Sequence, residues 1–166
     1  MIHDLDIHSL DVNPTATGEL VELYRDDWDV FDRAADGTDA DAVESDQAAS
    51  TPRMATMETA FPGTVDAWQR HPEGQVDHLT VPRGQIELGV YDDREDSPTQ
   101  GETSSIVMSE RDPILVRVPA GVWHGYQVLG SEPATILNFP DQLYEYYDPD
   151  LERLPADSDA VPYNWS

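Results

Sequence analysis

Short apolar runs separated by proline and glycine turns dominate the chain between residues 52 and 140. In residues 85–91, for example, Ile86, Leu88 and Val90 occupy alternate positions, which is the period of a strand with one buried face. The segments between the turns lack the apolar spacing of an amphipathic helix. This pattern predicts an all-β sandwich or barrel. The predicted strands cover residues 54–59, 65–71, 75–81, 85–91, 106–108, 114–118, 126–129 and 134–139.

The regions on either side of this strand-rich part are less regular. Residues 1–31 predict two short strands around a turn at Asn13-Pro14, with Trp28 and Phe31 closing onto the core. A helix over residues 18–28 is the alternative, because the apolar residues there also fit helical spacing loosely.

Two further segments differ sharply in composition. Residues 32–50 are nearly all Asp, Ala and small polar residues, which predicts a mobile acidic loop, because such a segment buries too little apolar area to offset chain entropy. A regulatory role for this loop is a minor alternative. Residues 141–166 carry many aromatic side chains, so we expect this tail to pack back across the barrel or onto a neighbouring subunit. With 166 residues, the chain predicts one domain spanning 1–166.

The charge balance is extreme, at a formal net charge of −25 with nine arginines and no lysine. Such a surface repels nucleic acid and anionic membranes, so we expect neither as a partner. Calcium binding is one interpretation, but no D-x-D-x-D-G loop is present. We favour a salt-adapted, halophilic protein whose acidic surface maintains solubility. Because the sequence has neither a long apolar run nor a leader-like N-terminus, we expect a cytoplasmic protein, and the lack of cysteine excludes thiol chemistry.

Two histidines are the first candidates for chemistry. The Pro119-Ala120-Gly121 turn delivers His124 onto the following strand, and His71 precedes the turn at Pro72. In a barrel both can point into one cavity. They would form a polar cluster with two amides, whose members are Gln69, His71, Gln75 and His124.

This cluster has three interpretations. Two imidazoles and two amides are a poor ligand set for a divalent ion, which prefers three histidines or histidine plus carboxylate, so we expect no metal and no other cofactor. The alternatives are a pocket that hydrogen-bonds an oxygen-rich ligand and a set of satisfied core polar groups.

Further residues are candidates for the same pocket. Arg83 lies in a predicted Pro-Arg-Gly turn at the cavity rim, where it could bind a carboxylate or phosphate or pair with a surface aspartate. Tyr126 and Asn138 fall on inward-facing strand positions, and His78 is interpreted as structural or rim.

Two motifs resemble a known family. The run at residues 90–101 contains Asp92, Arg94 and Ser97-Pro98-Thr99, and residues 118–129 contain Pro119, Gly121 and His124-Gly125-Tyr126. Their spacing is similar to that of the dTDP-4-dehydrorhamnose 3,5-epimerases of the cupin superfamily. The resemblance implies a double-stranded β-helix (cupin jelly roll), commonly a homodimer. It also implies a metal-independent enzyme that removes a proton beside the ketone of a nucleotide-linked sugar and returns it on the opposite face.

Three positions depart from the family pattern. Gln69 stands where the family has its histidine base, and Asn138 falls near the place of its proton-donating tyrosine. Residues 15–20 lack the arginine and aromatic residue of the family's phosphate-binding run.

The departures leave two functions open. In the first, the chain is an epimerase-like enzyme with His71 as base, Tyr126 or Tyr144 as donor, and a carboxylate that orients His71, for which the candidates are Asp66, Asp157 and Asp159. Gln69, Gln75, Arg83, His124 and Asn138 would then bind the substrate. In the second, it is a cupin that binds a sugar or nucleotide-sugar without catalysis.

Overall fold

The computed structural model describes residues 1–25, 27, 28, 30 and 51–165. The predicted acidic loop at 32–50 and the predicted core contact of Phe31 lie outside the described residues. The described strands are β1 (Asp6–Ser9), β2 (Val12–Thr15), β3 (Gly18–Val21), β4 (Thr56–Ala60), β5 (Val65–Arg70), β6 (Asp77–Arg83), β7 (Gln85–Tyr91), β8 (Thr103–Ser109), β9 (Ile114–Val118), β10 (Trp123–Val128), β11 (Ala134–Asn138) and β12 (Glu152–Arg153).

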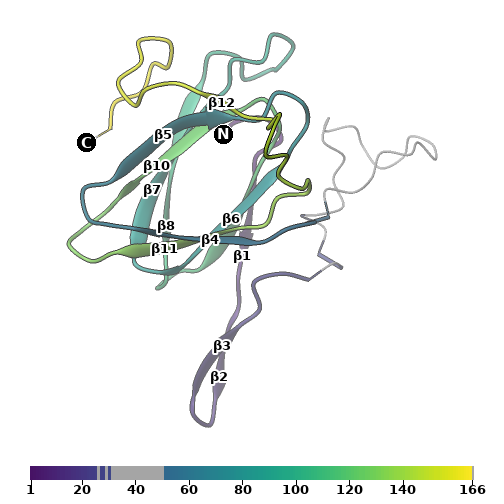
Figure 1. Cartoon of the computed structure of the whole chain (residues 1–166). Coiled ribbons are helices and arrows are strands. Elements are labelled where there is room, and N and C mark those ends of the chain that lie inside the picture. The colour runs from purple at the N-terminus through teal and green to yellow at the C-terminus, as the bar shows by residue number, and fades with distance from the viewer. Residues whose placement is uncertain (26, 29, 31–50, 166) are drawn as a thin grey trace.

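Two five-stranded antiparallel sheets form the body of the molecule (Figure 1). One sheet has the order β1-β9-β6-β11-β4 and the other β12-β5-β10-β7-β8. Their facing sides enclose the main core, in which Ile86, Leu88 and Val90 of β7 pack with Val116 and Val118 of β9. The period-two pattern in β7 is therefore the pattern of a strand whose inner face is buried. The prediction of an all-β barrel is confirmed. None of the described residues forms a helix long and apolar enough to cross a membrane.

The N-terminal region contains strands, as predicted, but its turn was misplaced. Asn13 and Pro14 lie within β2, and the turn to β3 is made by Ala16 and Thr17. The alternative of a helix starting at Gly18 is wrong, because that segment pairs with β2. The β2–β3 hairpin projects away from the barrel (Figure 1). As an exposed pair it can accept proline in a strand that has no further neighbour.

The C-terminal tail divides into two parts. Residues after Arg153 pack on the barrel, where Val161, Tyr163 and Trp165 contact the buried Trp68 of β5 in a separate core. Residues 143–147 instead leave their apolar and aromatic side chains exposed, and Tyr147 is fully exposed. The expectation that the tail packs onto the barrel therefore holds for its last part.

Candidate functional site

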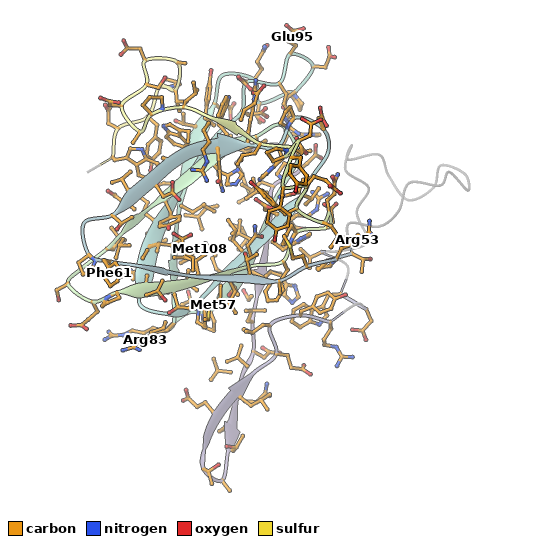
Figure 2. The ribbon with its side chains drawn as sticks, in the orientation of Figure 1. Arg53, Met57, Phe61, Arg83, Glu95 and Met108 are labelled. Carbon is orange, nitrogen blue, oxygen red and sulfur yellow. The ribbon has the colours of Figure 1, made fainter. Side chains whose placement is uncertain are left out.

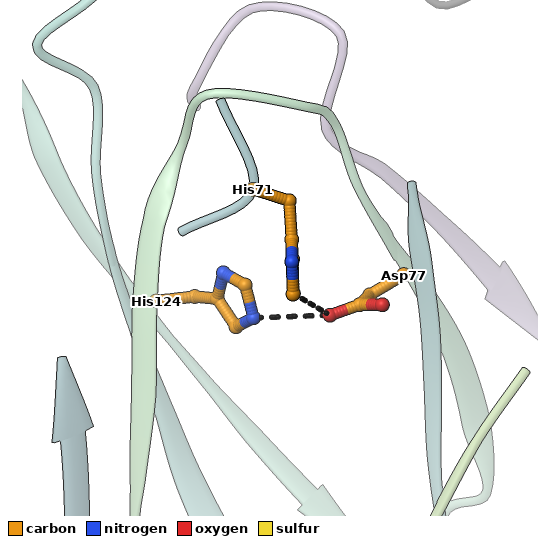
Figure 3. Close-up of side chains that lie close together, drawn as sticks. All are labelled: His71, Asp77 and His124. Carbon is orange, nitrogen blue, oxygen red and sulfur yellow. Dashed lines mark hydrogen bonds and ion pairs between the residues drawn. The ribbon is translucent and has the colours of Figure 1, made fainter. Parts of the chain in front are cut away.

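Two histidines and an aspartate converge inside the barrel. His71 Nε2 lies 3.1 Å from Asp77 Oδ2, and His124 Nε2 lies 3.2 Å from the same oxygen (Figure 3). The two imidazole ring centroids are 5.8 Å apart. All three residues are buried. We call this set the His–Asp–His cluster.

Each member of the His–Asp–His cluster comes from a different part of the fold. Asp77 begins β6, His124 lies in β10, and His71 directly follows β5. The turn before β10 contains Gly121 at φ 77°, a left-handed conformation that favours glycine, and its N–H donates to the His71 carbonyl at 2.9 Å. The Pro-x-Gly turn thus ties the backbone of one histidine to the strand that carries the other. The expectation that His71 and His124 meet is confirmed.

The backbone determines which nitrogen of each ring faces the centre. His124 Nδ1 lies 3.1 Å from the Val122 carbonyl, and His71 Nδ1 contacts the Asp150 carbonyl. A carbonyl oxygen only accepts hydrogen bonds, so each Nδ1 carries the proton and each Nε2 points at Asp77. Two nitrogen lone pairs facing one carboxylate would repel it. Positive charge at the centre of the His–Asp–His cluster, either as protons on the imidazoles or as a bound cation, would remove this repulsion.

The electrostatics of the cluster agree with this geometry. Burial disfavours the charged form of Asp77, but hydrogen bonds from His124 and His71 outweigh burial and hold the pKa of Asp77 well below its usual range. Burial likewise disfavours the charged form of His71, yet Asp77 and the Asp150 carbonyl raise the pKa of His71 above its ordinary value. The cluster thus favours an ionised carboxylate beside a cationic partner.

The two predicted amides surround the cluster. Gln75 Nε2 donates to Asp77 Oδ1 at 2.9 Å, and Gln69 Nε2 lies 3.2 Å from His124 Nε2. The four residues of the predicted polar cluster are therefore brought together. The buried aspartate at their centre was missed, because Asp77 reads in the sequence as one more acidic residue among thirty-four.

A cavity of about 170 Å³ opens beside the cluster, inside the barrel. His124 and Gln69 line this cavity, whereas His71 lies behind them and is not a lining residue. The expectation that His71 faces the ligand directly is therefore wrong. The His71 side chain is connected to the cavity only through Asp77 and His124. The remaining polar lining residues are Thr56, Glu58, Asp66, Tyr126, Asn138 and Arg153.

Tyr126 contributes a phenolic hydroxyl group to the cavity wall. Its O–H donates to Glu58 Oε1 at 2.7 Å. Burial and the neighbouring Glu58 raise the pKa of Tyr126 above its ordinary value, so the phenol stays protonated at neutral pH. Asn138 also lines the cavity, but its Oδ1 accepts a hydrogen bond from the His78 N–H at 3.1 Å.

His78 itself is a structural residue, one of the two roles expected for it. Its side chain is fully buried and its Nδ1 lies 3.0 Å from the Phe139 carbonyl. Burial lowers the pKa of His78 to about 4, so the ring is neutral at physiological pH.

Arg153 is a cavity residue that sequence reasoning missed. It lies in β12, in the tail that was expected only to pack. Its guanidinium donates to Asp66 Oδ1 and to Gln69 Oε1, each at 3.2 Å. The sequence offered one signal, because this chain has only nine basic residues against 34 acidic ones, but no turn or motif distinguished Arg153 from the other arginines.

Several other predicted site residues lie elsewhere. Arg83 ends β6, is exposed and is not a lining residue of the cavity, and Figure 2 shows it pointing away from the barrel. The turn follows it at Gly84, so the rim position predicted for Arg83 is wrong. Asp157 and Asp159 line a separate surface hollow beside Tyr163, and Tyr144 is exposed. The partner of His71 is Asp77 rather than any of the three carboxylates predicted.

The Asp92 motif organises a loop rather than the cavity. The buried carboxylate of Asp92 accepts hydrogen bonds from Arg94 Nε at 2.9 Å, Ser97 Oγ at 2.5 Å and Thr99 Oγ1 at 2.7 Å. Arg94 also donates to the His3 carbonyl at 2.9 Å, which ties the N-terminus to this loop. The motif therefore stabilises the fold at one end of the barrel.

Comparison with known proteins adds to this geometry. A family model described as dTDP-4-dehydrorhamnose 3,5-epimerase matches residues 2–165. A relative in Haloferax volcanii, named as the probable low-salt glycan biosynthesis epimerase Agl13, is 42% identical over 165 residues, which is 99% of this chain and 95% of the relative. The Bacillus subtilis spore coat polysaccharide biosynthesis protein SpsL is 32% identical over 166 residues, covering 100% and 97% of the two chains.

Solved structures share the fold. A dTDP sugar isomerase from Desulfovibrio desulfuricans superposes with a TM-score of 0.82 at 25% identity, covering 99% of this chain and 92% of the other. The rmlC epimerase of Mycobacterium tuberculosis superposes with a TM-score of 0.77 at 18% identity, covering 98% and 74%. The barrel described above is thus the cupin jelly roll expected from the two motifs.

Proposed function

Because the chain belongs to the dTDP-4-dehydrorhamnose 3,5-epimerase family, we propose that it epimerises a nucleotide-linked keto-deoxysugar in glycan synthesis. The single observation that carries the proposal is the barrel cavity, in which the Tyr126–Glu58 pair and the His–Asp–His cluster meet. Moving a proton at a carbon beside a ketone needs a proton acceptor, a proton donor and positive charge near the enolate oxygen.

The cavity supplies each of these requirements. The Tyr126 hydroxyl keeps its proton and donates a hydrogen bond to Glu58, so in the proposed step the Glu58 carboxylate is the proton acceptor and the Tyr126 hydroxyl is the proton donor. The His–Asp–His cluster adjoins the cavity through His124, its lining member, and a proton or a cation held at the centre of the cluster would supply the positive charge. In this proposal Tyr126 is a catalytic residue, Gln69, His124 and Asn138 contact the substrate, and His71 is a positioning residue that acts through Asp77 and His124. Gln75 acts from behind by orienting Asp77.

Solvent deuterium exchange tests this function. The protein is incubated in D2O with a dTDP-linked 4-keto-6-deoxysugar, and deuterium at the carbons beside the ketone is followed by NMR. We expect exchange in the wild type, and a rate at least about 100-fold lower in Tyr126→Phe and in His71→Ala. The control is Tyr91→Phe, because Tyr91 is not a lining residue of the cavity. Unchanged exchange in Tyr126→Phe would remove that residue from the mechanism.

A second function is supported by one specific observation. By the motif resemblance, Gln69 stands where the family has its histidine base, and a glutamine side chain does not take up a proton near neutral pH. We therefore keep a binding cupin without catalysis as the alternative. Nucleotide-sugar binding by calorimetry, together with no deuterium exchange in the wild type, would establish that alternative.

We also propose that the protein is a homodimer. Strand β4 is an outer strand of its sheet, with Met57 72% exposed, and Phe61 just beyond it is 67% exposed (Figure 2). An uncovered apolar strand edge favours pairing with a second chain. Sedimentation equilibrium should give twice the chain mass, and Met57→Glu should shift it toward the monomer. A cytoplasmic location, like the absence of nucleic-acid and membrane partners, stays a prediction.

A further inference from the structure

The His–Asp–His cluster has a feature that the proposed reaction does not explain: two imidazole nitrogens face one carboxylate oxygen. Both Nε2 atoms and Asp77 Oδ2 converge on one point, and the ligand atoms of the three residues all lie within 4.8 Å of one another. The backbone carbonyls of Val122 and Asp150 keep the Nδ1 protons on the outside. The inner atoms are then two lone-pair donors and an anion, which is the donor set of a metal centre.

The distances fit a shared ion. Ligand atoms about 2.1 Å from one metal, at angles between about 90° and 110°, lie about 3.0–3.4 Å from each other. His71 Nε2 and His124 Nε2 lie 3.1 and 3.2 Å from Asp77 Oδ2. Both nitrogen–oxygen pairs therefore have the separation of two ligands on one ion, and the ligand nitrogens of the two histidines lie within 4.8 Å of one another.

The surroundings also fit a metal centre. Histidines that bind metals commonly donate their second ring N–H to a carbonyl or carboxylate, as both do here. Gln75 Nε2 donates to the outer oxygen Asp77 Oδ1 at 2.9 Å, which leaves Oδ2 for the centre. The His–Asp–His cluster is buried, unlike the exposed acidic groups that a chain of this charge carries in large numbers.

The carboxylate changes the conclusion drawn from the sequence. Two imidazoles and two amides are a poor ligand set for a divalent ion, whereas histidine together with a carboxylate is a good one. Asp77 supplies that carboxylate. We propose that His71, Asp77 and His124 bind one divalent transition-metal ion, of the class of Zn²⁺, Fe²⁺, Co²⁺ or Ni²⁺. Two imidazole ligands favour these ions over Ca²⁺ and Mg²⁺, which prefer oxygen.

The ion would lie next to the barrel cavity, because His124 and Gln69 line it. There it would polarise a carbonyl oxygen of the ligand. This last consequence rests on the proposed epimerase function, whereas the metal site does not.

Metal content tests the site directly. The protein is freed of metal with a chelator, dialysed against each ion in high salt, and analysed by mass spectrometry for bound metal. We expect about one transition-metal ion per chain, and Co²⁺ should give visible absorption bands typical of nitrogen and oxygen ligation. Asp77→Asn and His124→Gln should weaken binding at least about 100-fold, since even loss of an outer partner typically costs 10–100-fold. The exposed His3→Gln is the control and should bind as the wild type does.

Folding of the variants is checked separately by circular dichroism. If a variant fails to fold, the metal site is tested on the wild type alone. The melting temperature of the wild type should rise with one equivalent of metal and fall again when a chelator is added. Folded wild type that binds no transition metal, or binding that survives intact in both folded variants, would overturn the site. Neither outcome depends on deuterium exchange, so failure of the metal site and failure of the proposed reaction are distinguishable.

Discussion

Arg153 is a cation at a cavity wall in a chain of net charge −25, and its side chain is 54% exposed. An anionic nucleotide diphosphate approaching so acidic a protein needs such a group. We therefore expect Arg153→Ala to weaken dTDP binding about 10–100-fold, the range for loss of a charged hydrogen bond. Arg83→Ala is the matched control, because Arg83 lies outside the cavity. Calorimetry measures the dTDP affinity of both variants. If the two substitutions weaken dTDP binding equally, Arg153 does not have this role.

Asp92 is the residue at which stability depends most clearly on pH. Burial opposes its ionisation, but hydrogen bonds from Arg94, Ser97 and Thr99 outweigh burial and hold the pKa of Asp92 well below its usual range. A depressed pKa in the folded state stabilises the protein above the unfolded value near 4, and this stabilisation is lost as the pH falls below it.

Replacing Asp92 tests this contribution. We expect Asp92→Asn to lower the free energy of unfolding by about 3 kcal/mol at pH 7. The difference from the wild type should shrink as the pH drops from about 4 toward 2. Denaturant unfolding followed by tryptophan fluorescence measures both. Asp96 is an exposed residue of the same loop, so Asp96→Asn is the control and should change the free energy of unfolding little. If the difference in unfolding free energy between wild type and Asp92→Asn does not vary with pH, the ionisation of Asp92 is not the source of the stabilisation.

At the scale of the strands, the contact between β10 and β5 is unusually close at Gly125. A Cβ there would lie 2.7 Å from Ala67 Cα and 2.8 Å from the Asp66 carbonyl oxygen. Both are backbone atoms, so the strands would have to separate. We expect Gly125→Ala to destabilise by about 2–3 kcal/mol and to lower deuterium exchange, because His124 and Tyr126 flank it.

Gly101→Ala is the comparison for this strand contact. Gly101 has φ +83° and nothing within 4 Å of the added Cβ, so only backbone strain of about 1 kcal/mol is expected there. Thermal unfolding of both variants separates steric overlap from strain. If the two variants lose the same amount of stability, the close approach of β10 and β5 at Gly125 does not add to the cost of the substitution.

Strands and turns could be predicted because their signals are local. The alternation of Ile86, Leu88 and Val90 is visible in a short window, and it places β7 correctly. Asp77 and Arg153 could not be predicted, because their roles depend on partners that the fold brings together from distant positions. The prediction for Arg83 failed for a local reason: Pro82 suggests the start of a turn, yet β6 continues through Pro82 and ends at Arg83.

For the whole molecule, self-repulsion of 34 acidic against nine basic residues should dominate the response to salt. Lowering ionic strength lengthens the screening distance from about 3 Å at 1 M to about 10 Å at 0.1 M. We expect the melting temperature to fall steadily as KCl is reduced from 2 M to 0.1 M. A loss of even about 1 kcal/mol lowers it by about 2–4 °C in a chain of this size.

An uncharged osmolyte separates screening from general solvent effects. Sucrose at matched osmolality should not replace KCl if charge repulsion is the cause. A melting temperature that is independent of KCl would show that the acidic residues are not salt-adapted.

Asp150 reaches back to the site from near the end of the chain. Its carbonyl contacts His71 Nδ1, and its carboxylate accepts hydrogen bonds from the N–H groups of Glu73 at 2.8 Å and Gln75 at 3.1 Å. During synthesis every barrel strand from β4 to β11 leaves the ribosome before Asp150 does. A nascent chain that has not yet delivered Asp150 can therefore assemble most of its sheets while the His71 ring lacks its carbonyl anchor, so the His–Asp–His cluster is completed only after the strands that surround it have been made.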